Sequence, residues 1–277
     1  FERIFFHTFN LFKYKSFTIP TENCSSKKLF NKKVHLIGAG PSLNNDIDKI
    51  NLIPSDDEIF VSNFFPLTDI WLKLKPSHLI FADSGMWNND FVENIMINKK
   101  KKLYKILSKV SWDLNLYIPD LSENIIRKIL EKNAKINFIV YPTRSSYQNN
   151  IKIRSTLISK RIVPPKICNA ILVAIWISIM SKSKSLFLYG LDSAQFKNID
   201  TDQKTNEVLV SGPVHFYDGD NSHEKKKKTK LLYQRFQQIY IMFRDFHVIS
   251  IVAKLNGVDI TNLSSYSIID NFKRKII

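Results

Sequence analysis

The chain has 277 residues, of which 44% are hydrophobic, and its 41 lysine and arginine residues outnumber 25 aspartate and glutamate residues, a net charge of +16. This length is enough to bury a full core, and one large domain is expected rather than two. The charge favours phosphate-bearing partners such as nucleic acid, nucleotide sugars or an anionic membrane surface. The two distant cysteines, Cys24 and Cys168, exclude a disulfide framework, and we expect neither a signal peptide nor a membrane-spanning helix.

Residues 1–30 form a segment that we expect to be separate from the domain at 31–277. Five phenylalanines and several basic residues occupy its first half. This pattern is typical of a short amphipathic segment lying on a membrane, and a helix packed on the domain or on a partner subunit explains it equally well.

The chain is organised around a glycine turn. A short apolar run at 34–37 predicts a buried strand, and the turn Gly38-Ala39-Gly40-Pro41-Ser42 follows it. Glycines permit a sharp turn, and proline and serine suit the start of a helix, whose free amides favour an anion. A nucleotide phosphate is the expected guest. Because the third glycine of the dinucleotide fingerprint is absent, a purely structural turn that binds no ligand is the alternative interpretation.

Apolar runs and helical patterns alternate along the rest of the chain. The expected strands are 34–37, 58–62, 78–82, 114–118, 136–140, 185–189 and 247–252. The expected helices are 46–50, 90–107, 122–133, 166–181 and 224–245. This alternation predicts an α/β fold, a single Rossmann-like, doubly wound and mainly parallel sheet.

Polar residues follow several of these strands. Ligands of such sheets bind at the carboxyl ends of the strands, so we expect Asn63, Asp83, Ser84, Gly190 and Asp192 to lie near the glycine turn. Each of them alone is also explained as a cap or turn residue.

We expect residues 193–223 to form a lid over the edge at which the strands end. The second half of the stretch is loop-like and contains His215, Tyr217 and His223, and the lysine run 225–228 follows. The histidines lack metal-ligand spacing, so no metal ion and no cofactor are expected.

Three stretches resemble the bacterial sialyltransferases of glycosyltransferase family 42, known from Campylobacter-type lipooligosaccharide synthesis. The first is the run 34–43. The second is Arg161-Ile162 together with the apolar helix and the stretch 186–192 that follow it. The third is Asp220-Asn221-Ser222-His223. The resemblance covers about 33–252 and implies a GT-A-like variant of the fold with a lid.

The resemblance implies an inverting, metal-independent transfer from a CMP-linked nonulosonic acid. In the family, the glycine turn holds the donor phosphate and a histidine takes the proton of the acceptor hydroxyl. The donor-binding residues that this implies here are Gly38, Ala39, Gly40, Pro41, Ser42, Asn63, Asp83, Ser84, Gly190 and Asp192.

The chain departs from the family at two important positions. Ala39 replaces the asparagine of the glycine turn, and Lys227 aligns with the catalytic histidine. The base is therefore expected at His223 or His215, with Arg161 and Tyr217 stabilising the leaving phosphate.

These observations favour a sialyltransferase-like enzyme that adds a sialic acid or related sugar to a bacterial surface glycan. Its substrates would be a CMP-nonulosonate donor and a glycan or glycolipid acceptor. The enzyme would be cytoplasmic and would bind peripherally to the inner face of the inner membrane. The sequence is also compatible with a homo-oligomer. One alternative is a protein similar to pterin or nucleotide pyrophosphokinases or to motility accessory factors, with magnesium at Asp83 and Asp192. The other is a basic nucleic-acid-binding protein, which would need exposed aromatics in a groove.

Overall fold

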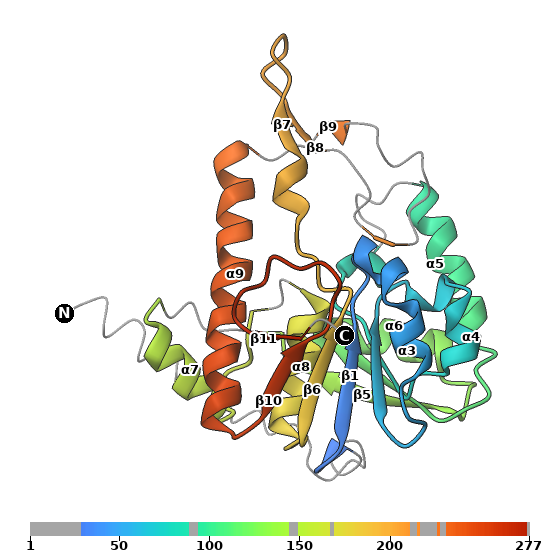
Figure 1. Ribbon diagram of the computed structural model, residues 1–277. Coiled ribbons are helices and arrows are strands. Elements are labelled where there is room, and N and C mark those ends of the chain that lie inside the picture. The colour runs from blue at the N-terminus through green and yellow to red at the C-terminus, as the bar shows by residue number, and fades with distance from the viewer. Residues whose placement is uncertain are drawn as a thin grey trace.

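The computed structural model describes residues 29–88, 94–143, 149–166, 169–210, 215–216, 226–227 and 231–275. The separate segment expected at 1–30 lies almost wholly outside this part of the chain. The described part is an eight-stranded sheet with helices on both faces, and a small three-stranded sheet stands beyond its upper edge (Figure 1).

The large sheet is parallel throughout, in the order β11-β10-β6-β1-β2-β3-β4-β5. Its strands are β1 (Lys33–Ile37), β2 (Glu58–Ser62), β3 (His78–Ile80), β4 (Leu114–Pro119), β5 (Ile136–Tyr141), β6 (Ser185–Tyr189), β10 (Asp259–Asn262) and β11 (Lys273–Arg274). The predicted doubly wound α/β fold is therefore confirmed.

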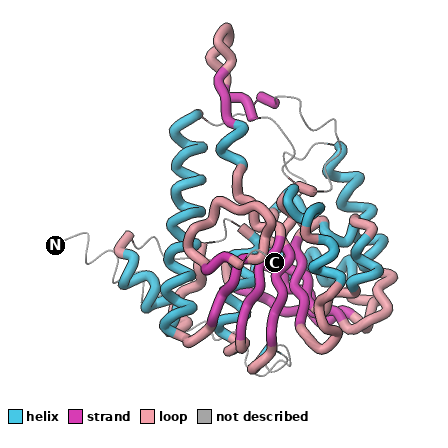
Figure 2. The backbone as a smooth tube through the Cα atoms, viewed as in Figure 1, coloured by secondary structure: helices cyan, strands magenta, loops and turns pink. Residues whose placement is uncertain are grey.

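Two groups of helices cover the two faces (Figure 2). One face packs against α3 (Ile47–Asn51), α4 (Ile70–Leu74), α5 (Asn94–Leu107) and α6 (Glu123–Leu130). The other packs against α7 (Ile151–Ser159), α8 (Ala170–Met180) and α9 (Leu232–Leu255). Every residue of α8 is buried, as its wholly apolar sequence predicts.

The short elements connect this framework. The 3-10 turns are η1 (Pro41–Asn45), η2 (Phe65–Leu67), η3 (Ser84–Met86), η4 (Asp120–Ser122) and η5 (Gln195–Asn198). The small antiparallel sheet consists of β7 (Ile199–Thr201), β8 (Val208–Val210) and β9 (Lys226–Lys227). It takes up part of the stretch predicted to be a lid.

One predicted strand is wrong. Residues 247–252 lie inside α9, which begins at Leu232 rather than at 224 and continues to Leu255. The run is rich in β-branched residues, but Val248, Ile249 and Val252 are buried in the core that α9 shares with α8 and β10. Tertiary packing of a long helix outweighs a local preference for strand.

Candidate functional site

The carboxyl ends of four neighbouring strands meet at one edge of the sheet. Strands β6, β1, β2 and β3 are adjacent and parallel, so the segments that follow them emerge side by side. The segments after β6, β1 and β2 begin with Gly190, Gly38 and Asn63, and Asp83 is the third residue after β3. The topology thus brings the predicted donor-binding residues to the same edge.

The glycines serve first to pack two loops together. Gly38 N donates to Tyr189 O at 2.8 Å, and Gly40 N donates to Gly190 O at 2.9 Å. A Cβ atom on Gly38 would lie 2.5 Å from Gly190 O, and Gly190 itself has a φ of +57°. The glycine turn is therefore required by the close approach of two loop backbones, whether or not a ligand is present.

Asp192 occupies the place expected for a phosphate. Ser42 N donates to Asp192 Oδ2 at 2.8 Å, and the Ser42 hydroxyl donates to Oδ1 of the same carboxylate. In this structure an internal carboxylate therefore binds the amide and hydroxyl of Ser42, the groups that were predicted to receive the donor phosphate. Asp192, also predicted to bind the donor, directs its carboxylate to Ser42. Burial raises the pKa of Asp192, and its hydrogen bonds with Ser42 oppose that rise.

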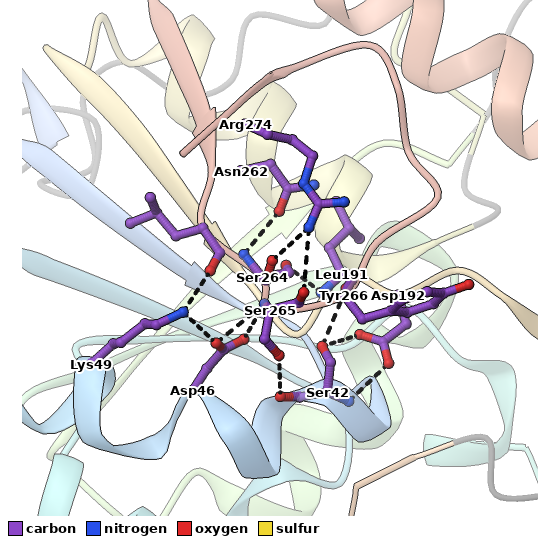
Figure 3. A network of polar contacts seen from close by, with 11 residues as sticks. Ser42, Asp46, Lys49, Leu191, Asp192, Asn262, Ser264, Ser265, Tyr266 and Arg274 are labelled. Carbon is purple, nitrogen blue, oxygen red and sulfur yellow. Dashed lines mark hydrogen bonds and ion pairs between the residues drawn. The ribbon is translucent and has the colours of Figure 1, made fainter. Parts of the chain in front are cut away.

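The C-terminal segment 263–275 covers this carboxylate (Figure 3). Ser265 N donates to Asp46 Oδ2 at 3.0 Å, its hydroxyl donates to Ser42 O at 3.1 Å, and Tyr266 O lies 3.3 Å from the Ser42 hydroxyl. Lys49 Nζ donates to Asp46 Oδ1 at 2.9 Å. The start of η1 is therefore fixed from both sides.

Further polar contacts fasten the same segment to the loop after β6. Leu191 N donates to the Ser264 hydroxyl at 3.0 Å, and the Ser267 hydroxyl donates to Leu191 O at 2.6 Å. Arg274 donates to Ser267 O and to Ser264 O at 2.9 and 3.0 Å. Sequence analysis missed this segment; the serines at 264, 265 and 267, just after a short apolar run, were the available signal.

Asn63 connects the ends of β2 and β3. It adopts a φ of +48°, and its Oδ1 accepts from Ala82 N at 3.0 Å and lies 3.4 Å from Asp83 N. Asp83 Oδ1 accepts from Gly85 N at 2.9 Å, and both Asp83 and Ser84 are exposed. With its oxygen engaged, Asn63 can offer a ligand its Nδ2 group.

A histidine of the predicted lid lies against the glycine turn. Phe216 N donates to Ala39 O at 2.8 Å, and the Phe216 ring packs against Phe65 with 5.8 Å between centroids. These contacts hold the half-buried His215 at the carboxyl edge of the sheet. His223 and Tyr217 lie outside the described residues.

Arg161 lies at the opposite edge. It follows α7 with a φ of +60°, and its guanidinium donates to Met180 O at the end of α8. The next turn of chain places Lys182 O 3.0 Å from Asn31 N, just before β1 begins. The structure thus places Arg161 at the amino edge, away from the other predicted site residues that it describes.

Among the described residues, no three or more histidine, cysteine, aspartate or glutamate side chains come together as a metal ion would require. Asp192, one of the two carboxylates considered for a magnesium site, directs both oxygens to Ser42.

Comparison with known proteins gives a distant likeness of fold. No protein-family model and no curated protein matches the chain. Solved structures that it resembles include the sialyltransferase CstII from Campylobacter jejuni in complex with the substrate analogue CMP-3FNeuAc, with 14% identity, 88% of this chain and 85% of that one covered, and a TM-score of 0.46. The MAf glycosyltransferase from Magnetospirillum magneticum AMB-1 gives 12% identity and a TM-score of 0.46, over 89% of this chain and 34% of that one. A mammalian sialyltransferase gives 11% identity and a TM-score of 0.37, over 94% and 85%. Likenesses of this size carry no functional argument, so function is argued from the residues.

Proposed function

We propose that the chain is a glycosyltransferase that moves a sialic acid or a related nonulosonic acid from a CMP-sugar to a hydroxyl group of a bacterial surface glycan. One observation carries the proposal: the 2.8 Å hydrogen bond from Phe216 N to Ala39 O holds the residue that follows His215 against the glycine turn. A histidine near the edge where parallel sheets bind their ligands is what a transfer to a hydroxyl group needs, because that reaction requires a base next to the bound donor.

The chemistry follows from ordinary acidities. A sugar hydroxyl ionises far above pH 7, and imidazole is a suitable general base at cellular pH. The base accepts the hydroxyl proton while the acceptor oxygen bonds to the anomeric carbon, and the bond from that carbon to the CMP phosphate breaks. CMP leaves with the electron pair, and attack from the opposite face inverts the configuration at the carbon. His215 is the first candidate for the base and His223 the second.

The donor must bind where the edge is open. Because Asp192 holds Ser42, we propose that the nucleotide lies over the ends of β2 and β3, with Asn63 Nδ2 and the exposed Asp83 and Ser84 as contacts. Tyr217 and the lysine run 225–228 are proposed to stabilise the leaving phosphate. The enzyme is proposed to act at the cytoplasmic face of the inner membrane.

Calorimetry tests the donor class. CMP, UDP and GDP are titrated into the full chain, once in a chelator and once with magnesium. CMP should bind at least ~10-fold more tightly than the other two, in chelator as well as in magnesium, because the donor is a CMP-sugar and the base is a side chain. Binding of UDP or GDP in preference to CMP, or CMP binding only with magnesium, contradicts the proposal.

Substitution of His215 tests the base. His215→Ala should lower turnover by at least ~100-fold, the loss expected for a general base, while CMP affinity stays unchanged. CMP release from CMP-sialic acid is measured against a panel of sugar acceptors. His247→Ala is the matched control, since His247 is exposed on α9. Loss of turnover in His223→Ala alone moves the base to His223, and parental rates in both variants refute a histidine base.

A further inference from the structure

The first two turns of α9 expose a face of large apolar side chains. The exposed fractions are 60% for Leu231, 40% for Leu232, 65% for Tyr233, 49% for Phe236 and 62% for Tyr240. Leu232, Phe236 and Tyr240 recur every four residues, so they share one side of the helix, with Tyr233 beside them. We call these five residues the α9 face.

The α9 face is held rigidly away from the core. Most of the second half of the helix is buried, including Phe246, Ile249 and Val252, and an ion pair of 3.0 Å joins Arg154 Nη1 of α7 to Asp245 Oδ1. Because α9 leads into the start of β10, its first half extends in the direction of the carboxyl edge, beyond the large sheet (Figure 1). Contiguous exposed apolar surface of this kind marks an interaction site.

Its charged surroundings are cationic. The single acidic residue of α9 is Asp245, which is buried and paired. Arg235 lies in the first half of α9 and is half-buried. The Arg244 guanidinium stands 5.7 Å from the centre of the Tyr240 ring, and its Nε lies 3.8 Å from Asp245 Oδ1. In the sequence, five lysines at 225–228 and 230 directly precede the helix.

We propose that the α9 face docks the protein on an anionic lipid bilayer. Aromatic and aliphatic side chains next to cations, on a helix half that carries no acidic residue, suit the boundary between headgroups and acyl chains. A second copy of the chain fits less well, because five partly exposed side chains offer on the order of 600 Å², below the about 800 Å² per partner of a stable interface. None of the described helices is long and apolar enough to span a bilayer, so α9 would lie on the surface.

This docking would bring the membrane to the side of the molecule where the candidate site opens. Under the proposed function, which this one statement assumes, the acceptor would be a lipid-linked glycan presented at that surface. The docking itself depends only on α9 and is tested without any transfer reaction.

Vesicle co-sedimentation of the full chain tests the proposal. Vesicles of phosphatidylcholine with phosphatidylglycerol should retain the protein, and vesicles of phosphatidylcholine alone should retain much less, with binding falling as salt rises. The triple variant Tyr233→Ser, Phe236→Ser, Tyr240→Ser should lower the bound fraction by roughly tenfold or more. The matched control is Leu52→Ser, Leu72→Ser, Leu121→Ser, whose parent side chains are 81%, 67% and 71% exposed elsewhere.

A second readout reports insertion directly. Tryptophan introduced as Tyr240→Trp should be quenched by brominated phosphatidylglycerol vesicles, whereas Leu121→Trp should not be quenched beyond the parent chain. Unchanged sedimentation of the triple variant overturns the proposal. So does a concentration-dependent dimer that the triple variant abolishes without vesicle binding, or binding of a single-stranded oligonucleotide through these residues in place of vesicles.

Discussion

Asp192 shows how a single side chain changes the meaning of a sequence pattern. A strand, a glycine turn and a helix start make an anion site, and the structure does place an anion there. The anion is the chain's own carboxylate, which accepts from Ser42 and lies under the C-terminal segment. The physical reasoning about the turn holds, and only the identity of the guest differs.

His35 is a second residue whose surroundings define its chemistry. Its Nε2 lies 2.9 Å from Asp57 Oδ2, and its Nδ1 lies 3.1 Å from the Tyr189 hydroxyl. Burial lowers the pKa of His35 from the usual 6.5, outweighing the hydrogen bond and the charge of Asp57, which raise it; Lys33 lowers it further. Protonation therefore disfavours the folded state.

The stability of the protein should consequently depend on the protonation of His35. Because folding lowers this pKa, the contribution of His35 to the free energy of unfolding is full above about pH 6.5. It declines as the pH falls toward the pKa of His35 in the folded protein. In urea unfolding, the advantage of the parent over His35→Gln should shrink between about pH 7.5 and about pH 5.5. A growing advantage on acidification would mean that the Asp57 charge outweighs burial.

At the scale of elements, the loops after β1 and β6 behave as one unit. They share backbone hydrogen bonds beyond the ends of their strands and leave no room for a side chain on Gly40, whose Cβ would lie 2.6 Å from Gly190 O. The backbone of Gly40 is ordinary, with a φ of −64°. Its requirement for glycine is therefore steric.

Gly40→Ala should lower the free energy of unfolding by about 1–3 kcal/mol, because the methyl group overpacks two backbones and the Asp192 carboxylate. Gly85→Ala is the control, since its Cβ would have no neighbour nearer than 3.4 Å, and its effect should stay within about 0.5 kcal/mol. Urea unfolding of both variants measures the difference. Equal effects would contradict the steric explanation.

At the scale of the whole molecule, the fold separates a rigid amino edge from a more open carboxyl edge. Arg161, Lys182 and the start of β1 close the amino edge through backbone contacts. The carboxyl edge carries Asn63, Asp83 and His215, and the first half of α9 extends beyond it. Donor binding, proton transfer and membrane docking are thus all assigned to one end of the molecule.

The sequence alone determined the fold class and most of the central strands. Strands 58–62 and 185–189 match β2 and β6 to the residue, and the apolar helix is buried as expected. These features are local, because a short apolar run between turn residues can be satisfied in few ways other than as a buried strand. The grouping of polar strand ends at one edge followed from the parallel topology.

Only the tertiary structure decided the remainder. The run 247–252 is helical because packing on α8 and β10 compensates for its β-branched residues. Asp192 meets Ser42, and Ser265 meets Asp46, across separations of 150 and 219 residues. Such pairings depend on where the whole chain places each side chain, and no local period or spacing encodes them.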